Sequence, residues 1–190
     1  RSVGTITVLG YVYTSYAARG LPAVCADIEA YGAWYAVDGI FVDEVNATSS
    51  CATLAYYAGV AACVAASGRG GAAATLVFNA GASVPPCWYN ASWGAGVAPP
   101  TIVNFEGAFE SYEAWAPEPW VAGTDPRRWW HIVHTANGTL MQHAAAVQLS
   151  KARNAGWVYV TDRTLPNPYA GFPLQPLYLD DVIRWASNEI

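Results

Sequence analysis

The 190-residue chain is 54% hydrophobic and 12% charged, and its formal net charge at pH 7 is -5. This composition excludes a disordered chain and predicts one globular domain, residues 1–190, with a sizeable core. No apolar run reaches the ~20 residues of a membrane-spanning helix, and no cluster of basic residues suits nucleic acid. We therefore expect neither a membrane span nor a nucleic-acid partner.

In chain order, β-branched and aromatic runs alternate with segments whose apolar residues have helical spacing. The runs are apolar on both faces, which is typical of strands buried in a parallel sheet. We predict strands at residues 5–13, 39–44, 75–79, 101–106, 129–135 and 157–161. Helices are predicted from Leu21 to Tyr35 and at residues 51–67, 111–120, 139–154 and 179–187.

The connections between these elements fit the same pattern. A Gly-rich stretch at residues 67–71 ends the second helix, and Gly156 is predicted to stop the helix at residues 139–154. A Pro/Trp-rich loop covers residues 81–100, and a Pro-rich segment covers residues 165–176. Repeated strand–helix units predict an α/β protein with parallel strands.

Polar residues recur where the predicted strands end: Thr14, Asp43, Asn79, Glu106, His134 and Asp162. This repetition favours a (β/α)8 TIM-type barrel, because catalytic residues of such barrels lie at the C-terminal ends of the strands. A doubly wound sheet is the alternative. The absence of a Gly-rich phosphate loop after the first strand argues against it.

Two adjacent carboxylates, Asp43 and Glu44, end the second predicted strand. Burying a carboxylate is costly unless the group is paired or used. Successive side chains of a strand point to opposite faces, so both can face one site only if the chain bends there. In the alternative interpretation, one acid caps the next segment and the other faces water.

Four cysteines and three N-x-S/T sequons indicate a secreted protein, extracellular or in a cell wall. The asparagines of the sequons, predicted to be glycosylated, are Asn46, Asn90 and Asn137. Cys51 and Cys87 both lie near the predicted strand ends, which favours a Cys51–Cys87 disulfide, and the pairing of the other two cysteines stays open.

Several segments resemble the spherulin-4-like family, and in order they span nearly the whole chain. They are Gly10–Tyr16 (GYVYTSY), Asp38–Val45 (DGIFVDEV), Val103–Gly107 (VNFEG), His131–His134 (HIVH) and Tyr159–Asp162 (YVTD) with Asn167–Tyr169 (NPY). Characterised members are fungal endo-acting glycoside hydrolases on a (β/α)8 barrel. They cleave galactosaminogalactan, an exopolysaccharide with galactosamine and N-acetylgalactosamine units.

The resemblance implies that Asp43, Glu44 and Glu106 are the catalytic acids, in an enzyme that cleaves α-1,4 linkages. Members of the family have two further strand–helix units before the first of these motifs. We therefore expect that six units are present here, and that the first two are missing from this sequence or supplied by another segment.

Glycoside hydrolysis needs one acid to protonate the leaving oxygen and a second carboxylate to attack the sugar or activate water. We assign Asp43 as nucleophile or electrostatic stabiliser, Glu106 as general acid/base, and Glu44 to orienting the substrate. The exchanged roles of Asp43 and Glu44 are the alternative. A substrate acetamido group acting as the nucleophile is another.

Other polar and aromatic residues near the strand ends are predicted to bind the substrate: Tyr13, Tyr16, Asn79, His134, Tyr159 and Asp162. Tyr11 is assigned equally to this pocket and to the core. A sugar platform is one interpretation of Trp88, Trp93, Trp115 and Trp120, but ordinary packing is favoured for each of them taken singly.

We expect no metal and no cofactor, because His131 and His134 point to opposite faces of one strand and the four cysteines lack zinc-site spacing. His131 is predicted to be a buried, hydrogen-bonded residue, and the protein to be a monomer with a polysaccharide substrate. The alternative function is a non-catalytic carbohydrate-binding or spore protein on the same fold.

Overall fold

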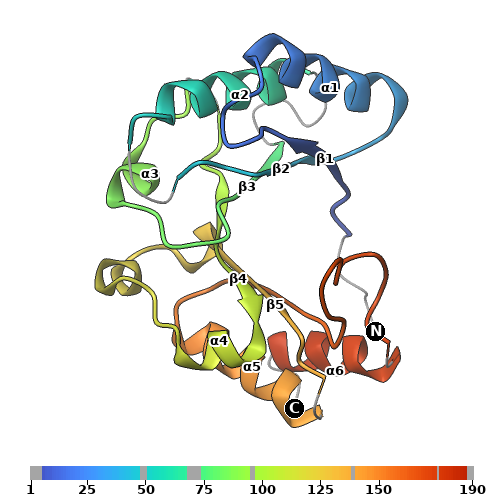
Figure 1. Ribbon diagram of the computed structural model, residues 1–190. Coiled ribbons are helices and arrows are strands. Elements are labelled where there is room, and N and C mark those ends of the chain that lie inside the picture. Colours follow the sequence, from blue (N-terminus) through green and yellow to red (C-terminus); the bar gives the residue numbers. More distant parts are fainter. Residues whose placement is uncertain are drawn as a thin grey trace. The chain divides into compact units, whose positions relative to one another are not determined.

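The computed structural model describes residues 6–47, 51–67, 74–94, 97–137, 140–174 and 176–187. It divides into two compact units (Figure 1). The first unit contains residues 1–80 and 84–102, and the second contains residues 81–83 and 103–190. The single domain predicted above stays a prediction. Residues 1–5, which include the start of the first predicted strand, and most of the Gly-rich helix end at residues 67–71 lie outside the described residues.

Three parallel strands and three helices make up the first unit. The strands are β1 (Leu9–Tyr13), β2 (Gly39–Asp43) and β3 (Thr75–Asn79), and the helices are α1 (Leu21–Trp34), α2 (Leu54–Ala66) and α3 (Pro86–Asn90). α1 and α2 lie side by side next to these strands (Figure 1). β3 has the predicted bounds, whereas α3 is a short helix within the predicted loop.

The side chains that α1 and α2 bury explain how the first unit holds together. Val24 and Ile28 of α1 and Tyr57 of α2 are fully buried, as their helical spacing predicts. A disulfide between Cys25 and Cys63 joins the two helices, with 5.5 Å between the Cα atoms. This second bridge completes the pairing that the sequence left open.

Gly39 sets how closely β2 and β3 approach each other. A Cβ atom at this position would lie 1.9 Å from the carbonyl oxygen of Thr75. Any larger residue would therefore push the two strands apart at the start of their pairing. The glycine of the Asp38-Gly39 turn is required by this close approach.

The second unit has a similar composition of strands and helices. Its strands are β4 (Thr101–Ala108), whose first two residues belong to the first unit, β5 (Trp129–His134) and β6 (Trp157–Val160). Its helices are α4 (Phe109–Ala114), α5 (Leu140–Ala152), α6 (Pro176–Ala186) and the 3-10 helices η2 (Pro119–Gly123) and η3 (Pro126–Arg128). α5 packs between α4 and α6 and against β6.

A buried polar pair lies in this unit. His131 of β5 is fully buried, and its Nδ1 atom lies 2.6 Å from the hydroxyl oxygen of Tyr112. The guanidinium of Arg153 lies over the Tyr112 ring, 4.6 Å from its centroid. The prediction that His131 is a buried, hydrogen-bonded histidine is confirmed.

The fold class is confirmed: the chain is an α/β protein with a six-stranded parallel sheet, in the order β1-β2-β3-β4-β5-β6. Among the described residues β1 and β6 are the two ends of this order, so the sheet is not closed. A barrel needs both end strands to be paired. The TIM-type barrel is therefore not confirmed and stays a prediction.

Two helix ends differ from the predictions for physical reasons. The helix predicted at residues 111–120 ends at Ala114, before the two prolines at positions 117 and 119. After α5, Asn154 takes the left-handed conformation that was expected of Gly156, with a φ of 61°. Gly156 instead allows a close approach, because a Cβ there would lie 2.8 Å from the carbonyl oxygen of Pro126.

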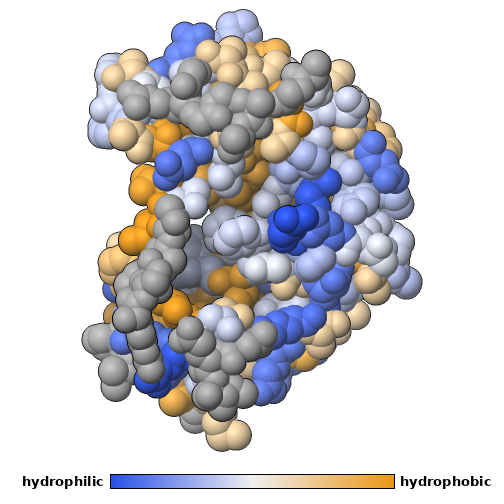
Figure 2. Space-filling view, turned by 180° about the vertical axis from the view of Figure 1, so that it is seen from behind, coloured by the Kyte–Doolittle hydropathy of each residue, from blue (hydrophilic) through white to orange (hydrophobic). Residues whose placement is uncertain are grey.

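Apolar side chains also lie on the surface, where Figure 2 shows them interspersed with hydrophilic residues. The most exposed large ones of the first unit are Ile6, Tyr16, Trp34 and Tyr35. No helix in the described part of the chain has both the length and the apolar character needed to cross a membrane.

Removing the Cys25–Cys63 disulfide is expected to destabilise the first unit. The bridge closes a loop of 38 residues in the unfolded chain, and such bridges are worth about 2–4 kcal/mol. The Cys25→Ser/Cys63→Ser variant should lose about this much free energy of unfolding in urea titrations. A variant as stable as the wild-type protein would show that native-state strain cancels the gain.

Acid is expected to weaken the folded state through His131. Burial, followed by the charge of Arg153, lowers the pKa of His131 from 6.5 to about 3. Below pH 6.5 the unfolded chain therefore binds a proton that the folded chain excludes, and stability falls toward pH 3 by about 1.4 kcal/mol per pH unit. Urea titrations between pH 7 and pH 4 should show a shallower decline for His131→Gln. Equal slopes would contradict the assignment.

Candidate active site

The carboxylate of Asp43, the last residue of β2, is held by three hydrogen bonds. The Tyr11 hydroxyl donates to Oδ2 at 2.7 Å. The Asn79 side-chain amide and the backbone N–H of Glu44 both donate to Oδ1, each at 2.8 Å. Donors from β1, from β3 and from the following residue thus fix both oxygens of one side chain.

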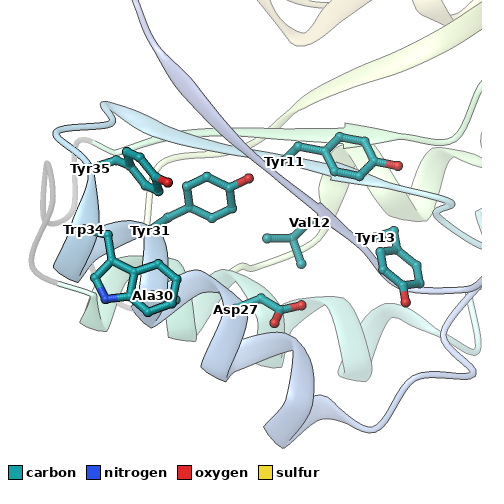
Figure 3. A pocket seen from close by; sticks show the side chains of 8 residues that line it. All are labelled: Tyr11, Val12, Tyr13, Asp27, Ala30, Tyr31, Trp34 and Tyr35. Atoms are coloured by element: carbon teal, nitrogen blue, oxygen red, sulfur yellow. The ribbon is translucent and has the colours of Figure 1, made fainter.

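The register of β1 and β2 explains why Tyr11 reaches Asp43. Tyr11 pairs with Phe41, and Tyr13 pairs with Asp43. The Tyr11 ring stacks on Phe41, with 6.4 Å between the centroids, while Val12 points to the opposite side of β1, toward α1 (Figure 3). Tyr11 therefore belongs to the Asp43 site rather than to the core, and it is 51% exposed.

The chain bends directly after Asp43. Glu44 has a φ of 54°, in the left-handed region that residues with a Cβ rarely adopt. The requirement that the strand must bend for both acids to serve one site is therefore met. Glu44 is partly exposed, and its side chain makes no hydrogen bond to any described residue.

Thr14, which follows β1, stabilises this bend by hydrogen bonds to its backbone. Its buried hydroxyl lies 2.8 Å from the carbonyl oxygen of Glu44, 3.2 Å from that of Asp43 and 3.1 Å from the Tyr57 hydroxyl. The backbone N–H of Tyr16 also donates to the Glu44 carbonyl at 2.8 Å. The loop after β1 thus fixes the backbone of both acids.

This loop is itself strained and anchored. Ser15, Tyr16 and Ala17 have φ values of 47°, 56° and 70°, and each such residue costs roughly 1–3 kcal/mol. Arg19 holds the loop by donating to the Tyr13 carbonyl at 2.7 Å, with its guanidinium 4.3 Å from the centre of the Tyr13 ring. Tyr13 and Tyr16, predicted to bind the substrate, are both exposed.

The second unit brings Glu106 and His134 near each other. Glu106 lies in β4, and His134 is the buried last residue of β5. Burial lowers the pKa of His134 below 6.5, and the charge of Glu106 partly opposes this shift. The Nδ1 atom of His134 lies 2.8 Å from the Thr135 hydroxyl. Thr135 has a φ of 58°, so β5 ends, like β2, in a left-handed residue.

Asp162 and Tyr159, the two remaining residues predicted to bind the substrate, make contacts with other residues of the protein. Asp162 is buried and accepts a hydrogen bond from the backbone N–H of Leu174 at 2.7 Å, which closes the loop after β6. The ring of Tyr159 lies 6.2 Å from that of Tyr169. A role of Asp162 and Tyr159 in binding substrate stays a prediction.

The proposed tryptophan platform is wrong for the two residues that were assigned to the loop before β4. Trp88 and Trp93 are buried against Phe78. The other two also make ring contacts: Trp115 packs on Phe105, and Trp120 on Trp129. Ordinary packing is the better interpretation of all four.

A hollow of about 420 Å³ lies on the first unit, between β1 and α1 (Figure 3). Tyr11 and Tyr13 line it together with Tyr31 and Trp34. Neither Asp43 nor Glu44 belongs to its lining. The hollow adjoins the Asp43 carboxylate through Tyr11, which lines it and donates to Asp43.

The remaining predicted sites have different outcomes. The Cys51–Cys87 disulfide is confirmed, with 6.2 Å between the Cα atoms.

The asparagines of the three sequons, Asn46, Asn90 and Asn137, are all exposed. Their glycosylation stays a prediction, and residues 48, 138 and 139 of these sequons lie outside the described part of the chain. Among the described residues no group of three or more His, Cys, Asp or Glu side chains could hold a metal ion.

Asp43 and Glu106 belong to different units, and their approach to a common substrate stays a prediction.

Sequence reasoning missed the bond between Tyr11 and Asp43. The signal that could have revealed it is the strand alternation that places Tyr11, Tyr13, Phe41 and Asp43 on one face of the β1–β2 pair.

These features define an α/β protein with carboxylates at or near the ends of parallel strands, an arrangement found in enzymes that work at the C-terminal edge of a sheet. The spherulation-specific family 4, Spherulin4, matches residues 2–183, and the chain belongs to this family.

Two known proteins are similar to this chain. A 56-residue segment is 43% identical to Spherulin-4 of Physarum polycephalum, and it covers 29% of this chain and 16% of that protein. The fold resembles the crystal structure of Aspergillus clavatus Sph3 in complex with GalNAc, with a TM-score of 0.74 at 24% sequence identity. That match covers 95% of this chain and 72% of Sph3.

The Thr14→Val substitution is expected to destabilise the first unit by about 1–3 kcal/mol. It keeps the shape of the side chain but removes the acceptor that the buried Tyr57 hydroxyl faces and one of the two donors at the carbonyl groups of Asp43 and Glu44. Urea unfolding measures the change.

The control is Thr53→Val, which removes an exposed bond to the carbonyl of Asn46 and should cost less. Equal losses for the two variants would show that the Thr14 hydroxyl does not brace the strand end.

Proposed function

We propose that the protein is a secreted endo-acting glycoside hydrolase, and that it cleaves α-1,4-linked galactosamine and N-acetylgalactosamine units in an exopolysaccharide of the galactosaminogalactan type. The observation that carries this proposal is the Asp43 carboxylate, fixed by three donors at the end of β2. Glycoside hydrolysis requires a pair of carboxylates held on either side of the scissile bond, and Asp43 is the better fixed of the two adjacent candidates, Asp43 and Glu44.

Asp43 acts on the anomeric carbon, as the nucleophile or as the charge that stabilises the oxocarbenium-like transition state. Glu106 protonates the leaving oxygen and then accepts a proton from water. Glu44 orients the sugar from the bend after β2. His134, neutral at pH 7 because burial lowers its pKa, serves as a hydrogen-bonding partner beside Glu106.

The sugar class is supported by the likeness in fold to Sph3, which was crystallised with GalNAc. Membership of the Spherulin4 family supports the same assignment through the known activities of its characterised members. Secretion, outside the cell or in its wall, is supported by the two disulfides and by three exposed sequon asparagines.

The direct test is to incubate the protein with purified galactosaminogalactan and to identify released oligomers by mass spectrometry. Oligomers of several lengths at early times indicate cleavage within the chain. The second candidate, a non-catalytic carbohydrate-binding or spore protein, is favoured by the similarity to Spherulin-4. It predicts retention on the immobilised polymer without release of oligomers.

The Asp43→Asn and Glu106→Gln variants are each expected to lose activity by at least about 10²-fold. Both substitutions keep the shape of the side chain and remove the charge or the transferable proton that the chemistry needs. Oligomer release per folded molecule is measured beside the melting temperature. Glu44→Gln is the control and should lose less.

Either variant that keeps more than about a tenth of wild-type activity shows that its carboxylate is not catalytic, because acid–base catalysis alone contributes about 10²- to 10⁴-fold. A complete loss in Glu44→Gln would exchange the roles of Asp43 and Glu44. A fall in melting temperature with unchanged turnover would make the acid structural.

A further inference from the structure

The three donors around Asp43 differ in origin. One is the backbone N–H of Glu44, which no substitution other than proline removes, and two are side chains, Tyr11 and Asn79. Asn79 is almost completely buried, whereas Tyr11 is 51% exposed. The two side chains stand on the strands that flank β2, so they hold the carboxylate from both sides.

We propose that Tyr11 and Asn79 are positioning residues that hold the Asp43 carboxylate in one orientation. This inference rests on the proposed function and goes further, because it names the two side chains that keep the Asp43 carboxylate in place for the reaction. It also changes the role of Asn79, which the sequence assigned to the substrate.

The hydrogen bonds fix the orientation of the Asp43 carboxylate. An ionised carboxylate can accept hydrogen bonds at both of its oxygens. Oδ1 receives two donors and Oδ2 receives the Tyr11 hydroxyl. The carboxylate therefore cannot turn about its Cβ–Cγ bond without breaking hydrogen bonds at both oxygens.

Glu44 lacks such support. Its backbone is fixed by Thr14 and Tyr16, but its carboxylate makes no hydrogen bond or ion pair with any described residue. A side chain with free rotation loses the advantage of a fixed geometry at the reacting carbon. Glu44 therefore suits contact with a sugar hydroxyl or amine, and Asp43 suits the reaction itself.

Tyr11 offers a clean test because its ring has an independent anchor. The ring stacks on Phe41, so Tyr11→Phe removes the hydroxyl and keeps the packing. Tyr35→Phe is the matched control: Tyr35 is another exposed tyrosine that lines the same hollow as Tyr11, and it has no bond to Asp43.

The experiment measures kcat and KM of oligomer release from galactosaminogalactan for the wild-type protein and both variants. Tyr11→Phe should lower kcat by about 10- to 100-fold, as expected for a hydrogen bond to a charged group. Its KM should change less than about threefold, since the bond acts on a catalytic group. Tyr35→Phe should match the wild type.

A Tyr11→Phe variant with wild-type kcat would overturn the proposal. So would a variant that only melts earlier and keeps its turnover per folded molecule. Asn79→Asp, which replaces the donor by a second carboxylate, should lose at least as much activity as Tyr11→Phe. Retention of full activity in this variant would overturn the proposed role of Asn79.

A wild-type protein that releases no oligomers refutes the proposed function, and this outcome differs from a failure of the positioning role. The positioning role is then tested in crystals of the wild type and Tyr11→Phe at the same pH. An Asp43 carboxylate that turns or takes several orientations in the variant supports the proposal. An unchanged carboxylate overturns it.

Discussion

The candidate site depends on the hydrogen bonds that Thr14 makes beneath the end of β2. Its hydroxyl reaches the carbonyls of two consecutive residues, Asp43 and Glu44, at the point where the backbone enters the left-handed region. A left-handed glutamate persists only where its surroundings over-determine it. The buried threonine and the loop after β1 provide that support, and the three donors around Asp43 become effective because the backbone beneath them is fixed.

The spacing of apolar residues predicted most helices and strands of the first unit. It also predicted the succession of all six strands along the chain. The apolar runs gave the bounds of β3, and the face of α1 gave Val24 and Ile28 as core residues. Such predictions succeed because burial on a regular element repeats with the period of that element. Closure of the sheet could not be predicted in the same way, since pairing between end strands leaves no local pattern in either strand.

The candidate acids were named from the sequence and its family resemblance, but the residues that hold Asp43 in place were not. Tyr11 looks like a core residue because a strand that is apolar on both faces has no polar face to mark the site. The sequence showed that both acids could face one site only if the chain bends there, but it could not predict the bend at Glu44. Glutamate gives no local signal for a left-handed φ. Trp88 was assigned to a loop, whereas it packs in a short helix. Each case depends on contacts between residues far apart in the chain.

The two units differ in the chemistry that stabilises them. Both disulfides, and hence all four cysteines, belong to the first unit. All three histidines belong to the second, and burial lowers the pKa of each. A reducing medium therefore acts on the half that carries Asp43, and an acidic medium acts on the half that carries Glu106. The environment can weaken the support of one carboxylate while the other stays in place.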